Sequence, residues 1–190
     1  MINLLTKILL IISNALLVPD ILLLFFFTGV TVVYLGGIIA EYLKRKKYEP
    51  LFREFISEIK SHPERRLRVE DIPSNYGFVS KVLMKMPRGA YEKQLDDAQL
   101  AMESAVSRLS LGIRLGPMLG LAGTLIPLGP ALVAMAEGNI AALSQNLVIA
   151  FTTTVVGLFI GGVSYVMYLI RQRWYAQDLN DLEFIIKRLE

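Results

Sequence analysis

The sequence contains no cysteine and only one histidine, His62. The missing cysteines exclude disulfide bonds and thiolate metal sites, and the Asp and Glu residues form no cluster spaced to hold a metal. Charged residues are also absent from three long stretches, residues 21–40, 115–136 and 147–170. Without ionisable groups, these stretches cannot perform acid–base chemistry by themselves. We therefore expect no enzyme activity, no metal and no cofactor.

The three uncharged stretches have the length of membrane spans. A helix needs about 20 mainly apolar residues to cross a bilayer, and the chain is 54% hydrophobic with a mean hydropathy of +0.49. We predict an all-α, polytopic membrane protein with transmembrane helices at residues 20–43, 115–136 and 146–170. The first is not a cleavable signal, because it is long and no small-residue cleavage site precedes the basic run at residues 44–47.

Residues 1–19 contain a shorter apolar run that ends at Pro19 and Asp20. This run is too short to cross a bilayer, and Lys7 adds polarity at its start. We expect an N-terminal amphipathic helix that lies at the membrane interface or at the edge of the helix bundle. The core of a signal peptide is the alternative.

The basic residues are distributed unevenly. All Lys and Arg residues except Lys7 lie in residues 41–114 and 171–190. The positive-inside rule therefore predicts an external N-terminus and a cytoplasmic C-terminus in the inner membrane. Residues 44–114 form a cytoplasmic helical loop, and residues 137–145 form an external loop. Contact with anionic membrane lipids explains the basic residues better than binding to nucleic acid does.

Two of the predicted helices extend past their spans into the cytoplasm. Apolar residues at spacings of three and four precede the second span: Leu95, Ala98, Met102, Ala105, Leu109 and Ile113. No helix breaker intervenes before Pro117, so we predict one helix from Tyr91 through the second span. The third helix continues through the C-terminal residues 171–190 with a similar seam: Tyr175, Leu179, Leu182, Ile186 and Leu189. These seams pack within the chain or against neighbouring subunits.

The loop itself has a weaker helical pattern. Residues 51–61 have apolar residues on one helical face, and His62 before Pro63 ends the pattern because proline disfavours helix in the preceding residue. Residues 71–77 read as a turn-rich connection, and residues 78–86 as a short helix.

Small residues share helix faces inside the spans. Thr154, Gly157, Gly161 and Ser164 lie at spacings of three and four, and so do Gly116, Gly120 and Thr124. Such faces allow helices to approach closely, or they line a water-filled path with hydroxyls, and both interpretations stay open. The glycines expected to pack helices are Gly116, Gly120, Gly123, Gly157 and Gly161.

Pro127 and Pro130 lie inside the second span. Each removes a helix hydrogen bond, so we expect a kink and free carbonyl groups at Gly123 and Ile126. No carboxylate is expected in the interior of the predicted spans, because Asp20 and Glu137 are expected at the outer edge and Glu41 at the inner edge. If protons cross this protein, another chain therefore supplies the titrating group.

Two motifs resemble the MotA/TolQ/ExbB proton channel family. Residues 116–124, GPMLGLAGT, are similar to the family signature PxLGLxGT, and residues 150–158, AFTTTVVGL, are similar to its third-helix segment AxxxTxxGL. Three spans with an external N-terminus and a large cytoplasmic loop resemble the ExbB/TolQ type. One position departs from that type, because Ile149 stands where a glutamate often precedes the third-helix threonine.

The resemblance implies a function and a set of roles. Thr124 and Thr154 would line the pore of a homo-oligomeric ring of about five subunits. The ring would surround a pair of single-span, ExbD/TolR-like partner helices that carry the essential membrane aspartate. The chain would then be the channel or stator subunit of an ion-driven motor, with proton flow producing rotation or force for a process such as protein transport. A non-conducting scaffold and a small solute transporter subunit are the alternatives. The transporter is disfavoured because Pro127 and Pro130 have no counterpart in the third helix.

Overall fold

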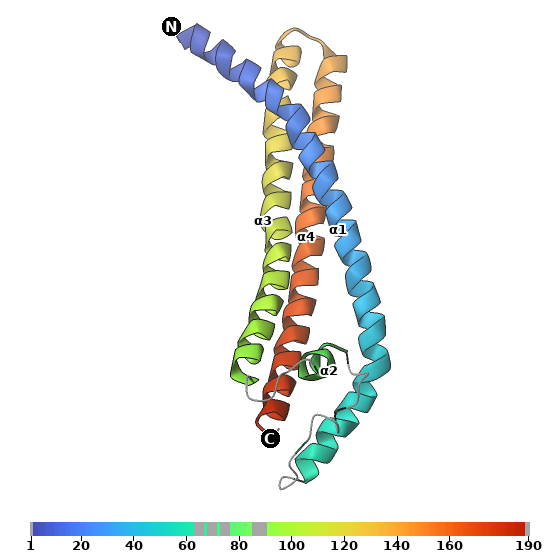
Figure 1. Ribbon diagram of the computed structural model, residues 1–190. Helices are drawn as coiled ribbons and strands as arrows, with labels where there is room; N and C mark the ends of the chain where they lie inside the picture. Colours follow the sequence, from blue (N-terminus) through green and yellow to red (C-terminus); the bar gives the residue numbers. More distant parts are fainter. Residues whose placement is uncertain (1, 63–66, 68–71, 73–76, 85–90, 189–190) are drawn as a thin grey trace. The chain divides into compact units, whose positions relative to one another are not determined.

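The computed structural model describes residues 2–62, 67, 72, 77–84 and 91–188. Four helices make up this part of the chain: α1 (Ile2–Ser61), α2 (Gly77–Met84), α3 (Tyr91–Ala136) and α4 (Ile140–Ile186) (Figure 1). Three of them, α1, α3 and α4, contain segments long and apolar enough to cross a membrane. The predicted all-α fold with three spanning helices is therefore confirmed.

Helix α1 is longer than the sequence pattern suggested. It runs through Pro19 and Asp20 without an end, so residues 1–19 are not a separate helix. Proline holds φ near the helical value, and spanning helices tolerate it where neighbours satisfy the freed carbonyl. The helix ends at Ser61, before the His62–Pro63 pair. The placement of residues 1–19 at the membrane interface stays a prediction.

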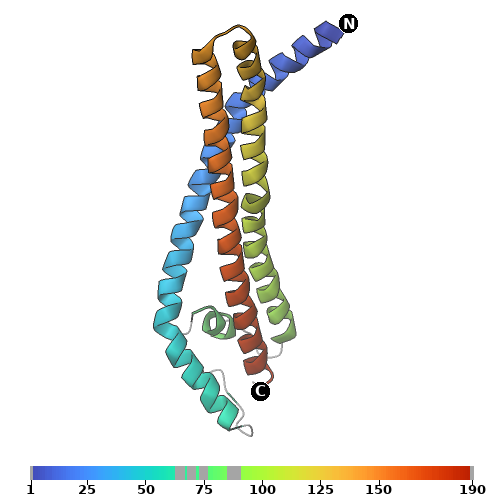
Figure 2. The same cartoon turned by 180° about the vertical axis from the view of Figure 1, so that it is seen from behind.

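Helices α3 and α4 extend beyond their apolar stretches, as predicted. They run antiparallel and side by side in both views (Figure 1, Figure 2). The turn between them needs glycine, because Gly138 has a φ of 70°. The next residue caps α4, since the Asn139 Oδ1 accepts a hydrogen bond of 3.1 Å from the amide of Ala142. The two long helices thus form one hairpin.

The chain divides into two compact units. The first unit consists of Met1–Leu35 and Leu109–Met167, and the second of Gly36–Arg108 and Tyr168–Glu190. Large apolar side chains cover the outside of the first unit, including Phe25 at 74% and Phe151 at 67% exposed. Such a surface is stable against lipid hydrocarbon and not against water, in agreement with the spans.

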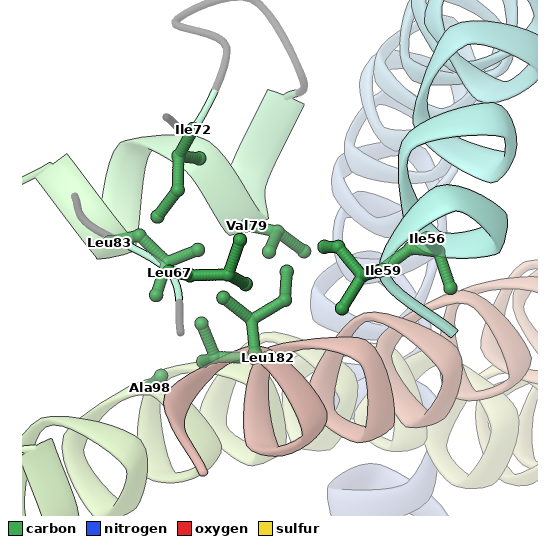
Figure 3. Packing of buried hydrophobic residues seen from close by; sticks show 9 residues of the cluster. Ile56, Ile59, Leu67, Ile72, Val79, Leu83, Ala98 and Leu182 are labelled. Carbon is green, nitrogen blue, oxygen red and sulfur yellow. The ribbon is translucent and has the colours of Figure 1, made fainter. Parts of the chain in front are cut away.

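The second unit has a hydrophobic core of its own (Figure 3). It combines buried residues of all four helices and of the loop: Ile56, Ile59, Leu67, Ile72, Val79, Leu83, Ala98, Leu182 and Ile185. Helix α2 corresponds to the helix predicted at residues 78–86, although residues 85 and 86 lie outside the described residues. The predicted turn at residues 71–77 lies mostly outside them too, as does Leu189 of the predicted seam.

Charged side chains join α1 to α4 within the second unit. Arg45 donates hydrogen bonds to Asp178, one of them 2.8 Å from Nη1 to Oδ1. Its guanidinium carbon lies 5.0 Å from the centre of the Trp174 ring, which stacks on Tyr42. Asp178 is only 9% exposed, so its charge is paired and largely removed from water. This pair fixes the register of α1 against α4 in the second unit.

Candidate functional site

Small residues allow α3 and α4 to touch through their backbones in the first unit. A Cβ atom added to Gly116 would stand 2.7 Å from the Gly157 carbonyl oxygen and 2.8 Å from the Gly161 nitrogen. A Cβ on Gly120 would stand 3.2 Å from the Gly157 Cα, and one on Gly161 would stand 2.8 Å from the Pro117 ring. No larger side chain fits at these positions without separating the helices. The contacts lie within one chain.

The predicted pore threonines lie on or near this interface. Thr154 is half-buried, and its hydroxyl is within hydrogen-bond distance of the Ala150 carbonyl at 3.2 Å and the Gly120 carbonyl of α3 at 3.3 Å. The Thr124 hydroxyl donates to the Leu121 carbonyl at 2.7 Å. Each hydroxyl therefore bonds to backbone and leaves its lone pairs free to accept a proton donor.

Thr152 and the two prolines of the second span differ from one another in exposure. Thr152 is exposed and donates to the Val148 carbonyl at 2.7 Å. Pro127 is fully buried inside α3, and Pro130 is half-buried; the helix continues through both. A role for these prolines as kinks stays a prediction, as does pore lining by Thr124 and Thr154.

Gly123 faces a different set of atoms from the other glycines. A Cβ atom there would stand 2.6 Å from the Thr153 Oγ1 of α4 and 2.9 Å from the Asp20 Oδ2 of α1. Three helices therefore meet at Gly123, and a carboxyl group points at the meeting point. Asp20 is 6% exposed, and its Oδ2 is buried without a hydrogen-bond partner among the described residues.

The structure places Asp20 inside helix α1, whereas its expected place at the outer edge of the membrane stays a prediction. We expected this carboxylate at the outer edge of the first span, where water would solvate it. In the structure it lies level with Gly123, and about 20 Å of helix separates Gly123 from the end of α3 at Ala136. The hydrocarbon core of a bilayer is about 30 Å thick. Because α1 continues through Pro19, Asp20 belongs to the interior of a helix and not to its start.

A signal for this carboxyl was present in the sequence. Asp20 is the only charged residue between Lys7 and Glu41, and apolar residues precede and follow it. A charged residue within such a run usually marks a functional position in a membrane helix. Because we predicted a helix boundary at Pro19, we expected Asp20 at the start of a helix and not inside one.

Comparison with known families identifies the region around α3 and α4. The model of the MotA/TolQ/ExbB proton channel family matches residues 55–183. The chain belongs to the MotA/TolQ/ExbB proton channel family. Neither a curated protein nor a solved structure matches the chain.

Membership in the MotA/TolQ/ExbB family makes the chain a proton channel-type subunit of a membrane motor. The matched residues include Thr124, Thr154 and the α3–α4 glycine faces, so these features belong to the region that the family shares. The match begins after the apolar part of α1, so it does not include Asp20. The ExbB/TolQ type within the family stays a prediction.

Proposed function

We propose that the chain is the channel subunit of a proton-driven inner-membrane motor of the ExbB/TolQ type. About five copies would form a ring around a single-span partner, and a membrane aspartate of that partner would accept and release the transported proton. One charge that crosses 100 mV releases about 2.3 kcal/mol. A few protons therefore supply enough free energy for a conformational step, which the partner passes on as rotation or force.

The observation that supports this proposal most directly is the geometry at Thr154. Its hydroxyl lies where α4 touches the Gly120 carbonyl of α3, within the region matched by the family. A threonine that donates to carbonyls keeps acceptor lone pairs, so a protonated carboxyl of a partner helix can donate to it. Polar groups of this kind along a span are what a proton carrier needs in hydrocarbon.

Valine substitutions test the threonine path, because valine nearly matches threonine in shape and lacks the hydroxyl. We expect Thr124→Val and Thr154→Val each to lower proton flux about two- to tenfold, since a hydrogen bond from a neutral, protonated carboxyl contributes roughly 0.5–1.5 kcal/mol. Flux is measured with a pH-sensitive dye in vesicles that contain the chain and the single-span protein that co-purifies with it.

Thr152→Val is the matched control. Thr152 is exposed and bonds to its own helix, and it points about 200° away from Thr154 around α4. Its variant should conduct nearly as well as the wild type, and all three variants should assemble equally. Equal flux in all three would contradict the threonine path.

A non-conducting scaffold is the second candidate. The close backbone contact between Gly116 and Gly157 supports it, because these faces are occupied by packing within one chain. Imaging of the complex with its co-purified partner counts the subunits, and a ring without proton flux would favour the scaffold over the channel.

A further inference from the structure

The Asp20 carboxyl lies in the first unit under conditions that an ionised group does not tolerate alone. It is 6% exposed, and no described residue donates a hydrogen bond to its Oδ2. An ionised carboxylate only accepts hydrogen bonds. Burying such a charge without a partner costs several kcal/mol, so the group needs a proton or a cation to neutralise it.

No charged side chain of the neighbouring helices is placed to neutralise Asp20. Along α3 the nearest charged residue to Gly123 is Arg114, and along α4 the nearest to Thr153 is Arg171; Glu137 lies in the turn between the two helices. Each lies about 13 Å or more of helix away. The tyrosines of these spans, Tyr34, Tyr165 and Tyr168, lie about 18 Å or more of helix from Asp20 on α1 or from Thr153 on α4.

The atoms around Asp20 suit a proton better than a metal ion. A hard cation takes about six oxygen ligands. The side-chain oxygens that a Cβ on Gly123 would meet are those of Asp20 and Thr153. The described residues contain no group of three His, Cys, Asp or Glu side chains that could hold a metal ion. The Thr153 hydroxyl donates to the carbonyls of Ile149 and Ala150, at 3.0 and 2.9 Å. It can therefore accept a hydrogen bond from a protonated carboxyl.

We propose that Asp20 is a proton-binding group of this chain, which takes up and releases a proton where α1, α3 and α4 meet. Uptake forms one O–H bond on the carboxyl and removes its negative charge; release returns the proton to water or to another carboxylate. The Thr153 Oγ1 and the Asp20 Oδ2 make no hydrogen bond to each other in the structure, but both face the space that Gly123 leaves. We expect Thr153 to accept the hydrogen bond of the protonated form in that space. Asp20 is thus a second proton-binding carboxyl besides the membrane aspartate proposed for the partner helix. This inference rests on the proposed function only for the supply of protons.

Infrared spectroscopy of the full chain in lipid vesicles tests this site directly. A protonated carboxyl has a C=O stretching band that an ionised one lacks. The chain has 17 Asp and Glu side chains, so the Asp20 band is isolated as the difference between the wild-type and Asp20→Asn spectra. We expect this difference spectrum to show a protonated-carboxyl band at acidic pH and to lose it as the pH rises. Circular dichroism and size-exclusion chromatography show whether the variant is folded. Identical carboxyl spectra for wild type and variant, or a difference band that does not change with pH, would overturn the proposal.

Two further variants separate proton binding from a merely structural role. Thr153→Val should move the Asp20 band to higher wavenumber, because the C=O stretch rises when the carboxyl loses a hydrogen bond. Thr152→Val is the control and should leave the band unchanged, because Thr152 is exposed. A band that is the same in the Thr153 and Thr152 variants would exclude Thr153 as the partner of Asp20.

The measurement requires neither the partner nor proton flux. If vesicles with wild type and partner conduct no protons, the proposed function fails, and the spectra still decide whether Asp20 binds a proton. If the vesicles conduct protons and the spectra show no titrating Asp20, only the further inference fails.

Discussion

Two aspartates one turn apart on α4, Asp178 and Asp181, have different surroundings. Asp178 pairs with Arg45, whereas Asp181 is half-buried beside it. Burial raises the pKa of the Asp181 carboxyl above its ordinary value, the charge of Asp178 raises it further, and Lys60 and Arg53 act in the opposite direction. The folded chain thus holds this proton more tightly than the unfolded chain. The stability that it contributes is present at low pH and is lost as the pH rises through the folded-state pKa.

Replacing Asp181 should therefore stabilise the protein at neutral pH. We expect Asp181→Asn to raise the melting temperature in detergent at pH 7, and the difference from wild type to disappear at a pH below the ordinary range of aspartate. Asp96→Asn on the exposed surface of α3 is the control and should have little effect. A difference that is the same at both pH values would show that the charge of Asp181 is not its cause.

Single residues also mark the limit of what the sequence revealed. The motifs around Thr124 and Thr154 could be read directly, because signature residues have fixed spacings. The role of Asp20 could not, because it depends on whether α1 continues through Pro19. Local preference makes proline a frequent helix boundary, and packing against Gly123 and Thr153 overrides that preference here.

At the scale of the helices, periodicity predicted α3 and α4 well. Leu95, Ala98 and Met102 follow the three-and-four spacing, and Ala98 and Met102 are buried as a packed seam requires. The sequence did not predict which helix packs against each glycine-containing face, because the spacing of small residues does not identify the neighbouring helix. The structure pairs the faces of α3 and α4 in the same chain.

The close approach of α3 and α4 leads to a prediction about their hairpin. A Cβ on Gly157 would stand 2.5 Å from the Gly116 carbonyl oxygen and 2.7 Å from the Gly120 Cα, and backbone atoms cannot move aside as side chains do. We expect Gly157→Ala to destabilise the protein by about 1–3 kcal/mol, the usual cost of overpacking. Unfolding in mixed detergent micelles measures the change.

Gly162→Ala is the matched control on the same helix. Gly162 is exposed, and a Cβ there would meet no atom within 4 Å. Alanine favours helix over glycine by up to about 1 kcal/mol, so this variant should be as stable as wild type or slightly more so. Equal losses in the two variants would contradict the close contact at Gly157.

At the scale of the whole molecule, the charge distribution predicts an orientation in the membrane. All basic residues except Lys7 lie on the same side of the predicted spans, which predicts that the α3–α4 turn is outside and the C-terminus inside. Because the chain has no cysteine, introduced cysteines can report on each side without background.

Cysteine labelling in intact cells tests this orientation. We expect Glu137→Cys at the exposed turn to react with a membrane-impermeant maleimide. Lys187→Cys, which is exposed near the end of α4, should react only after the membrane is disrupted. The reverse pattern would invert the order of all three spans.

The burial of Asp20 has a consequence for biosynthesis. Residue 20 leaves the ribosome long before Gly123 and Thr153 are made, so at first its carboxyl has no helix to cover it. An aspartate within a spanning helix costs at most about 2.5–3.5 kcal/mol on insertion, the value for the helix centre, whereas each Leu, Ile, Phe or Val contributes about 0.3–0.6 kcal/mol in favour. The run of these residues at 21–27 can thus bring α1 into the membrane before its partners exist. Asp20 is then covered only when the α3–α4 hairpin is complete. A chain whose synthesis stops before that point exposes the Asp20 carboxyl to lipid, and proteases that degrade misfolded membrane proteins can recognise it.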